Sequence, residues 1–267
     1  MADFGGGIQA RRVHLLAVLA ISQATGLAGA AVVVAVGGHS MPSLSDLWPA
    51  AVGGIAGIIA LGAFYRGLAI GTMSIVAPIS ATGAAVPVLV GLATGDRPGA
   101  LVMAGIVIAV VGVVFAARED APEGSRAAAV ARRSVLLALV AALGFGTFFV
   151  GLDASADVDV WWALLAARVA SFSMLCVAVA VVRPEFPRSP QTLGFIAAIG
   201  AGDLAANACF AAATNEGLLS VVSVLASLYP VVTVLLARAV LGERVRREQG
   251  FGIAAALAGV ALIASGA

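Results

Sequence analysis

Long apolar runs separated by short polar breaks make up almost the whole chain. Residues 47–117 are nearly continuously apolar, and residues 189–264 repeat the same pattern of apolar stretches and breaks. A helix that crosses a bilayer needs about 20 apolar residues, and charged or turn-forming residues mark its ends. The pattern therefore predicts nine membrane-spanning helices, over residues 13–36, 47–70, 72–94, 98–117, 134–152, 160–182, 191–213, 218–238 and 248–265.

The two apolar regions also share the spacing of their glycine, serine and aromatic residues. Phe64 aligns with Phe210, and a near-constant offset carries forward from this pair. The further aligned pairs are Gly71 with Gly217, Ser74 with Ser220, and, after a one-residue gap, Gly95-Asp96-Arg97 with Gly242-Glu243-Arg244, Gly105 with Gly252 and Gly112 with Gly259. Two copies of one helical unit, with the substrate site between them, are typical of secondary transporters.

Composition supports an all-α polytopic membrane protein. Apolar residues make up 61% of the chain, charged residues 11%, and the mean hydropathy is +1.08. A soluble domain carries about 25% charged residues, so this set cannot build a solvated surface. The net charge of +1 gives no support for nucleic-acid binding. Gly5-Gly6-Gly7 lacks the Lys-Ser/Thr of a phosphate loop, and no cofactor or metal motif is found.

The two copies differ in the number of predicted spans. The second copy, residues 134–267, contains five, whereas the first copy, residues 1–117, contains four. Residues 2–9 carry glycines and a phenylalanine before a polar break, as the end of the second copy's first helix does. We therefore expect that the first helix of copy one is missing, through a start codon assigned too late or a short gene. The polar residues 118–133 are expected to form a linker.

Arginines in the short loops are divided unevenly between the two sides of the membrane. One side carries only Arg97, and the other carries Arg11, Arg12, Arg118, Arg126, Arg132, Arg133, Arg183, Arg188, Arg238, Arg244, Arg246 and Arg247. The positive-inside rule makes the arginine-rich side, with the linker, cytoplasmic. Because five helices are an odd number, the two five-helix copies must then point in opposite directions, as an inverted repeat.

The motifs of both copies resemble those of the drug/metabolite transporter superfamily, in its EamA-like branch. The matching stretches cover residues 64–71, 74–80, 217–222, 228–233 and 241–244. The most specific among them is Tyr229-Pro230 followed by Gly242-Glu243-Arg244. The resemblance implies a multi-pass carrier in the bacterial cytoplasmic membrane that moves small polar metabolites, amino acids or drugs, often as an exporter run by protons.

Two other classes of function stay open beside this carrier. A non-transporting pseudo-carrier or membrane scaffold is the alternative that the missing first helix raises. A membrane enzyme would need a polar catalytic cluster at one interface, and the short loops are poor in His, Asp and Glu. The sequence predicts neither the substrate nor the oligomeric state.

Charged and polar side chains inside the predicted spans are the candidates for substrate or coupling-ion binding. Asp203 lies near the middle of its span, where a carboxylate needs a cavity or a partner, and Asn207 is one turn along. Asp203 either binds a proton or substrate, or is a structural carboxylate. Arg168 lies deep in its span and either pairs with Asp203, grips an anionic substrate or serves helix packing. Ser22 and Gln23 occupy the matching place in copy one.

The remaining candidates lie near helix ends and prolines. Arg66, about a turn from a helix end, is expected to reach lipid phosphate, with a ligand contact as the alternative. Tyr229 offers a hydroxyl to the substrate or to a helix contact. Proline frees backbone carbonyls, so Pro78, Pro87 and Pro230 are each a hinge or a static kink. Glycines spaced seven residues apart in each copy's last helix, Gly105, Gly112, Gly252 and Gly259, favour close helix packing.

Overall fold

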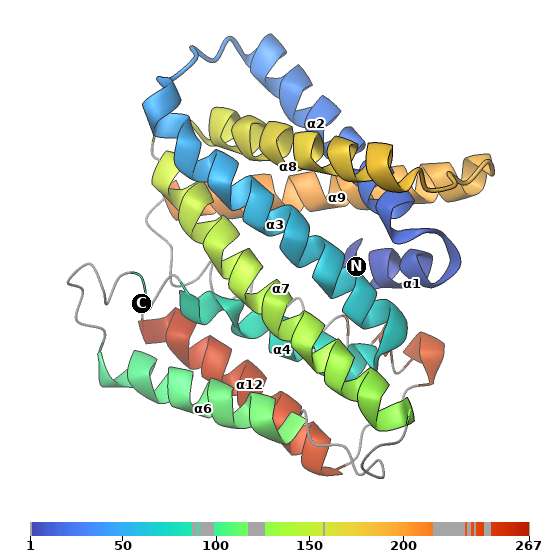
Figure 1. Ribbon diagram of the computed structural model, residues 1–267. Coiled ribbons are helices and arrows are strands. Elements are labelled where there is room, and N and C mark those ends of the chain that lie inside the picture. The colour runs from blue at the N-terminus through green and yellow to red at the C-terminus, as the bar shows by residue number, and fades with distance from the viewer. Residues whose placement is uncertain are drawn as a thin grey trace.

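Helices and turns make up the described part of the chain, which contains no strand. The computed structural model describes residues 2–86, 90, 99–116, 126–156, 158–215, 233, 236–237, 239–242 and 247–266. The helices are α1 (Ala2–Arg12), α2 (Leu15–Gly37), α3 (Leu44–Ile70), α4 (Met73–Ala81), the 3₁₀ turn η1 (Thr82–Ala84), α6 (Ala100–Ala116), α7 (Arg126–Ala156), α8 (Val160–Val182), α9 (Pro190–Asn215) and α12 (Arg247–Gly266) (Figure 1).

Five of the described helices are long and apolar enough to cross a membrane. They are Leu15–Gly37, Leu44–Ile70, Ala128–Ala156, Val160–Val182 and Pro190–Ala212, and each coincides with a predicted span. Two shorter apolar helices, Ala100–Gly112 and Gly250–Ile263, lie within the predicted spans 98–117 and 248–265. The prediction of an all-α, multi-pass membrane protein is therefore confirmed. The predicted span 218–238 lies almost entirely outside the described residues, so the total of nine spans stays a prediction.

The boundary of α7 differs from the predicted one. This helix begins at Arg126, so residues 126–133 of the expected linker are helical. They contain Ala127, Ala128 and Ala129, and alanine is the strongest helix former. A helix thus continues past the apolar stretch that marked the predicted start at residue 134.

The predicted span 72–94 is not one continuous α-helix. Helix α4 ends at Ala81 and the 3₁₀ turn η1 follows, with the Thr82 hydroxyl donating to the Ile79 carbonyl at 2.7 Å. A Cβ atom at Gly83 would overlap the carbonyl of Ala142 on α7, so glycine permits this close approach. Glycine is a poor helix former, and the tighter turn appears at this point. All nine residues of α4, Pro78 included, are buried.

Residues 2–12, which precede the first predicted span, form the short helix α1. It packs against α3 and α9 and buries Phe4, Gly5, Gly6 and Gly7 (Figure 1). The Arg11 guanidinium donates to the Leu68 carbonyl at 2.9 Å, near the end of α3. This bond satisfies a carbonyl in the last turn of that helix and fastens α1 to it.

The helices pack in two adjoining groups. Helices α3 and α7 run side by side through the centre, and α6 and α12 form a second close pair beside α4 (Figure 1). Helices α2, α8 and α9 lie on the other side of α3. The largest cluster of buried apolar side chains, which includes Phe64, Leu68 and Ile79, joins α3, α4 and α7.

The glycines spaced seven residues apart do permit close helix packing. A Cβ atom at Gly105 would meet the Gly259 carbonyl, and one at Gly112 would meet the Gly252 carbonyl. In lipid, van der Waals contact of this kind drives helix association because burial from water is not available. In the sequence alignment of the copies, Gly105 matches Gly252 and Gly112 matches Gly259. A two-fold rotation that exchanges α6 with α12 would therefore also exchange these two contacts. The inverted repeat as a whole stays a prediction.

Candidate functional site

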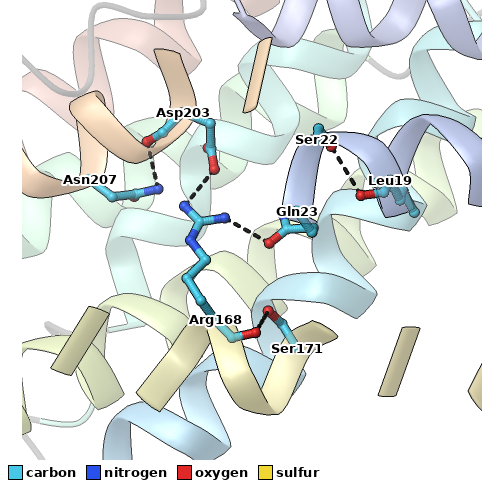
Figure 2. A network of polar contacts seen from close by, with 7 residues as sticks. All are labelled: Leu19, Ser22, Gln23, Arg168, Ser171, Asp203 and Asn207. Atoms are coloured by element: carbon cyan, nitrogen blue, oxygen red, sulfur yellow. Dashed lines mark hydrogen bonds and ion pairs between the residues drawn. The ribbon is translucent and has the colours of Figure 1, made fainter. Parts of the chain in front are cut away.

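Arg168 stands at the centre of a polar network that joins three helices. Its side chain extends from α8, and only 6% of the residue is exposed. The Nη1 group donates to Gln23 Oε1 on α2 at 2.7 Å, and Nη2 donates to Asp203 Oδ2 on α9 at 2.6 Å (Figure 2). A guanidinium at this depth in a membrane protein needs such partners, and the bond to the carboxylate is charge-assisted. Of the partners considered for Arg168, the structure pairs it with Asp203.

Close backbone contacts hold α9 against α2 and α8 against α3. A Cβ atom at Gly200 on α9 would overlap the Ser22 carbonyl on α2, and one at Gly54 on α3 would overlap the Ala167 carbonyl on α8. Gly26 leaves room for the Arg168 guanidinium, which would lie 3.4 Å from a Cβ atom there. The short side chains of Gln23 and Asp203 can therefore reach the guanidinium directly.

Two residues that the sequence analysis did not select, Tyr65 and Asp3, belong to the same polar centre. Tyr65 on α3 is 1% exposed, and it interacts electrostatically with Asp3, Asp203 and Arg168. Asp3 on α1 in turn interacts with Asp203. The sequence did contain a signal for these polar residues. Tyr65 carries a hydroxyl group within an apolar span, and Asp3 is an acidic residue just before the glycine run. Both residues therefore lie within electrostatic range of the Arg168–Asp203 pair.

Gly6 is the residue that lets Tyr65 approach α1. A Cβ atom at Gly6 would overlap the Tyr65 ring, and one at Gly7 would crowd the Leu68 side chain. Asp3 lies three residues before Gly6, which places both on one side of the helix. The glycine run thus serves the packing of α1 on α3.

The other sequence candidates lie apart from the Arg168 side chain or outside the described residues. Asn207 donates to the backbone carbonyl of Asp203 at 3.0 Å, so it does not bond the carboxylate (Figure 2). Arg66 is exposed on the surface of α3, and Pro78 is buried within α4. Pro87, Tyr229 and Pro230 lie outside the described residues.

A groove of about 420 Å³ lies between α2 and α8, but its lining is apolar. Phe172, Leu175 and Phe186 are among its lining residues, with Cys176. This groove offers no hydrogen-bond partner for a polar substrate. Among the described residues, no group of three or more His, Cys, Asp or Glu side chains is placed to hold a metal ion.

A second polar contact fastens the helices at the start of α8. The Asp159 carboxylate accepts from the backbone N–H groups of Trp161 and Trp162, which caps α8. The same carboxylate contacts His39 Nδ1 at 2.8 Å, and the Trp162 indole N–H donates to the His39 carbonyl at 3.2 Å. These contacts tie the connection between α2 and α3 to α8.

Comparison with known proteins decides the family. Residues 132–265 match the sequence model of the EamA-like transporter family, which covers half of the 267-residue chain and both helices that supply Arg168 and Asp203. The chain belongs to the EamA-like transporter family. This membership confirms the resemblance drawn from the residue motifs and, with the apolar helices, a membrane protein of a transporter family.

Two further comparisons bear on this EamA-like protein. No curated protein matches its sequence. A solved crystal structure, described only as that of a protein, is similar with a TM-score of 0.58. The alignment covers 98% of this chain and 93% of the other, at 14% identity. At that identity the likeness shows a shared fold and nothing about the substrate.

Proposed function

We propose that this EamA-like protein is a secondary-active transporter of small polar molecules. The network of the buried Arg168 and Gln23 with the partly buried Asp203 carries this proposal. Ionisable groups within membrane-spanning helices are costly to bury and mark substrate or ion pathways by default. The network joins α2 to α8 and α9, and the sequence repeat assigns these helices to different copies. A binding centre between two copies is the arrangement that alternating access requires.

The chemistry of the centre favours substrates that carry charge. Arg168 presents a planar set of donors suited to a carboxylate or phosphate group. Asp203 accepts hydrogen bonds and suits an ammonium group. A substrate that pairs with either residue competes with the ion pair between them, because their bond at 2.6 Å already uses one guanidinium nitrogen. Substrate binding would thus exchange an internal contact for an external one and free α9 from α8.

The direction and the energy source are part of the same proposal. We place the protein in the bacterial cytoplasmic membrane, with its arginine-rich side facing the cytoplasm, and expect export of metabolites, amino acids or drugs. A carboxylate in the centre, with Asp203 as the first candidate, would couple this movement to protons. Protonation would remove the charge that Arg168 pairs with, which changes the relative stability of the two conformations.

Uptake into proteoliposomes against a panel of radiolabelled metabolites tests this function. The full chain should accumulate or exchange at least one member of the panel, and Arg168→Gln should reduce that rate by about tenfold or more. Arg66→Gln is the matched control because Arg66 is exposed on α3, and it should retain the rate. A correctly folded wild-type protein that moves no member of the panel would favour the non-transporting scaffold instead.

A further inference from the structure

Helix α1 packs on α9 through one of its glycines. A Cβ atom at Gly5 would lie 3.3 Å from the Phe195 ring and 3.2 Å from the Ile199 side chain. Ile199 is buried at this contact, whereas Phe195 keeps 48% of its surface exposed. The absence of a side chain on Gly5 brings the backbone of α1 close to α9, and this contact fixes where α1 sits along that helix.

The contact between α7 and α3 has the same arrangement. A Cβ atom at Gly151 on α7 would overlap the Pro49 carbonyl on α3 and lie 3.1 Å from the Gly53 Cα atom. These three residues are separated from their counterparts on α1 and α9 by the same number of residues as Phe64 is from Phe210. Helix α1 thus sits on α9 where the last turns of α7 sit on α3, as the predicted repeat requires.

Helix α7 also covers α3 further toward its own N-terminal end (Figure 1). A Cβ atom at Gly144 would lie 2.8 Å from both the Ala56 carbonyl oxygen and the Ala60 Cβ atom. The residues of α9 at the matching separation are Gly202 and Ala206. Among the described residues, a Cβ atom at Gly202 would have no neighbour within 4 Å, and Ala206 is exposed. The described structure thus leaves open on α9 the stretch that α7 covers on α3.

The open stretch of α9 includes Asp203, the partner of Arg168. The Asp203 side chain is 29% exposed. The matching residue of α3 is Gly57, where a Cβ atom would lie 3.0 Å from the Phe148 ring of α7. A carboxylate that faces hydrocarbon is costly, so a helix that lay on α9 as α7 lies on α3 would shield this side chain.

We propose that this face of α9, which comprises Gly202, Asp203 and Ala206, is the docking face of one further apolar helix that runs straight into the N-terminal end of α1. One continuous helix, α7, makes both sets of contacts on α3, so the docked helix should be in line with α1. Its contact side needs glycine or another small residue, because in lipid small residues let helix backbones approach closely. The docked helix closes the site of Arg168 and Asp203 on the side of α9 that is open here.

Disulfide cross-linking in lipid tests the docking face with a helix taken from the same protein. Residues 134–146 of α7 are fused directly before Met1, which keeps the register of the repeat and leaves out the arginines at the start of α7. Both native cysteines are replaced by alanine. Ala206→Cys on α9 and Gly144→Cys in the added copy should then cross-link on oxidation, because Ala60 and Gly144 are in contact at the matching place.

Leu143→Cys in the added copy is the matched control. Leu143 on α7 is 64% exposed, so its counterpart should point away from α9 and stay without a cross-link. Equal cross-linking from the two positions would contradict the proposed register. A covalent dimer of the unextended chain that carries only Ala206→Cys would assign the face to a second copy of the chain and overturn the proposal.

Labelling of the native cysteines gives a second test that needs no substitution. Cys209 lies about one turn along α9 from Ala206 and on the same side of the helix. Cys209 and Cys176 on α8 are both exposed, so a lipid-soluble maleimide should label both in the unextended chain. The added helix should prevent the labelling of Cys209 and leave that of Cys176 unchanged. Equal labelling of both in the extended chain would overturn the proposal even where the cross-linking variants fail to fold, and neither readout depends on transport.

Discussion

Arg168 on α8 and Gln23 on α2 hydrogen bond to each other at 2.7 Å, and in the predicted repeat Ser22 and Gln23 together occupy the place that matches Arg168. Two close backbone contacts involve the residues just before Gln23 and Arg168. Gly54 meets the Ala167 carbonyl, and Gly200 meets the Ser22 carbonyl. Gly54 and Gly200 are separated by the same number of residues as Phe64 and Phe210. In the predicted repeat these two backbone contacts correspond to within one residue, whereas Arg168 is a cation and Gln23 is a neutral amide.

The ion pair between Arg168 and Asp203 should behave as one unit in stability measurements. Removing one partner of a fully buried pair leaves an uncompensated charge and costs about 3–5 kcal/mol, and the cost here should lie towards or below the lower end because the Asp203 side chain is 29% exposed. We expect Arg168→Gln and Asp203→Asn each to lower the free energy of unfolding by an amount of this order. The double variant should cost less than the sum of the two, as interacting sites do. Thermal unfolding in detergent measures all three, and strictly additive costs would contradict the pairing.

Substitution of Gly6 should disturb Tyr65. The new Cβ atom of Gly6→Ala overlaps the Tyr65 ring, and overpacking of this kind costs about 1–3 kcal/mol. Gly202→Ala is the control, because a Cβ atom at Gly202 on α9 has no neighbour within 4 Å. There the alanine should stabilise the helix by roughly 0.5–1 kcal/mol. In a Tyr65→Ala background the cost of Gly6→Ala should fall, and an unchanged cost would show that another contact is responsible.

The pair of helices α6 and α12 should depend on Gly259. Its Cβ atom would overlap the backbone of α6 at Ala109, so Gly259→Ala should force the helices apart and lower the unfolding temperature. Gly250→Ala on the same helix meets nothing within 4 Å and serves as the control. Equal melting temperatures for the two variants would contradict the close packing of these helices.

Asp159 should stabilise α8 through its cap rather than through its charge alone. Asp159→Ala removes the acceptor for the Trp161 and Trp162 N–H groups and should cost about 1 kcal/mol, within the range for lost N-caps. Asp159→Asn keeps a capping oxygen and should cost less. If both variants lose equal stability in thermal unfolding, the contact to His39 would be the larger contribution.

The arginine-rich side should face the cytoplasm. A reporter enzyme that is active only in the cytoplasm should therefore be active when it is fused after Gly124, within the polar segment before α7. The same reporter fused after His39, which follows the C-terminal end of α2, should be inactive because that position faces the periplasm. The reverse pattern would contradict the orientation and leave the fold unchanged.

The sequence by itself determined the helices that cross the membrane. A spanning helix satisfies its backbone hydrogen bonds within one segment, so a run of apolar residues such as 160–182 is sufficient to predict it. The same principle identified Arg168 and Asp203, because a charge within such a run stands out against its neighbours. The family also followed from short motifs along the chain, and the matching family model confirmed it.

Only the tertiary structure decided which face of each helix is inside and which polar groups meet. On α8, Leu175 is 3% exposed and Val177 is 65% exposed, although both are apolar. Lipid and protein interior accept the same side chains, so the sequence does not distinguish the two faces. The bonds of Arg168 to Gln23 and Asp203, and the placement of Tyr65 against Gly6, depend on how helices distant in sequence pack together. That packing, and not the residues of any one segment, makes Arg168, Gln23 and Asp203 a single site.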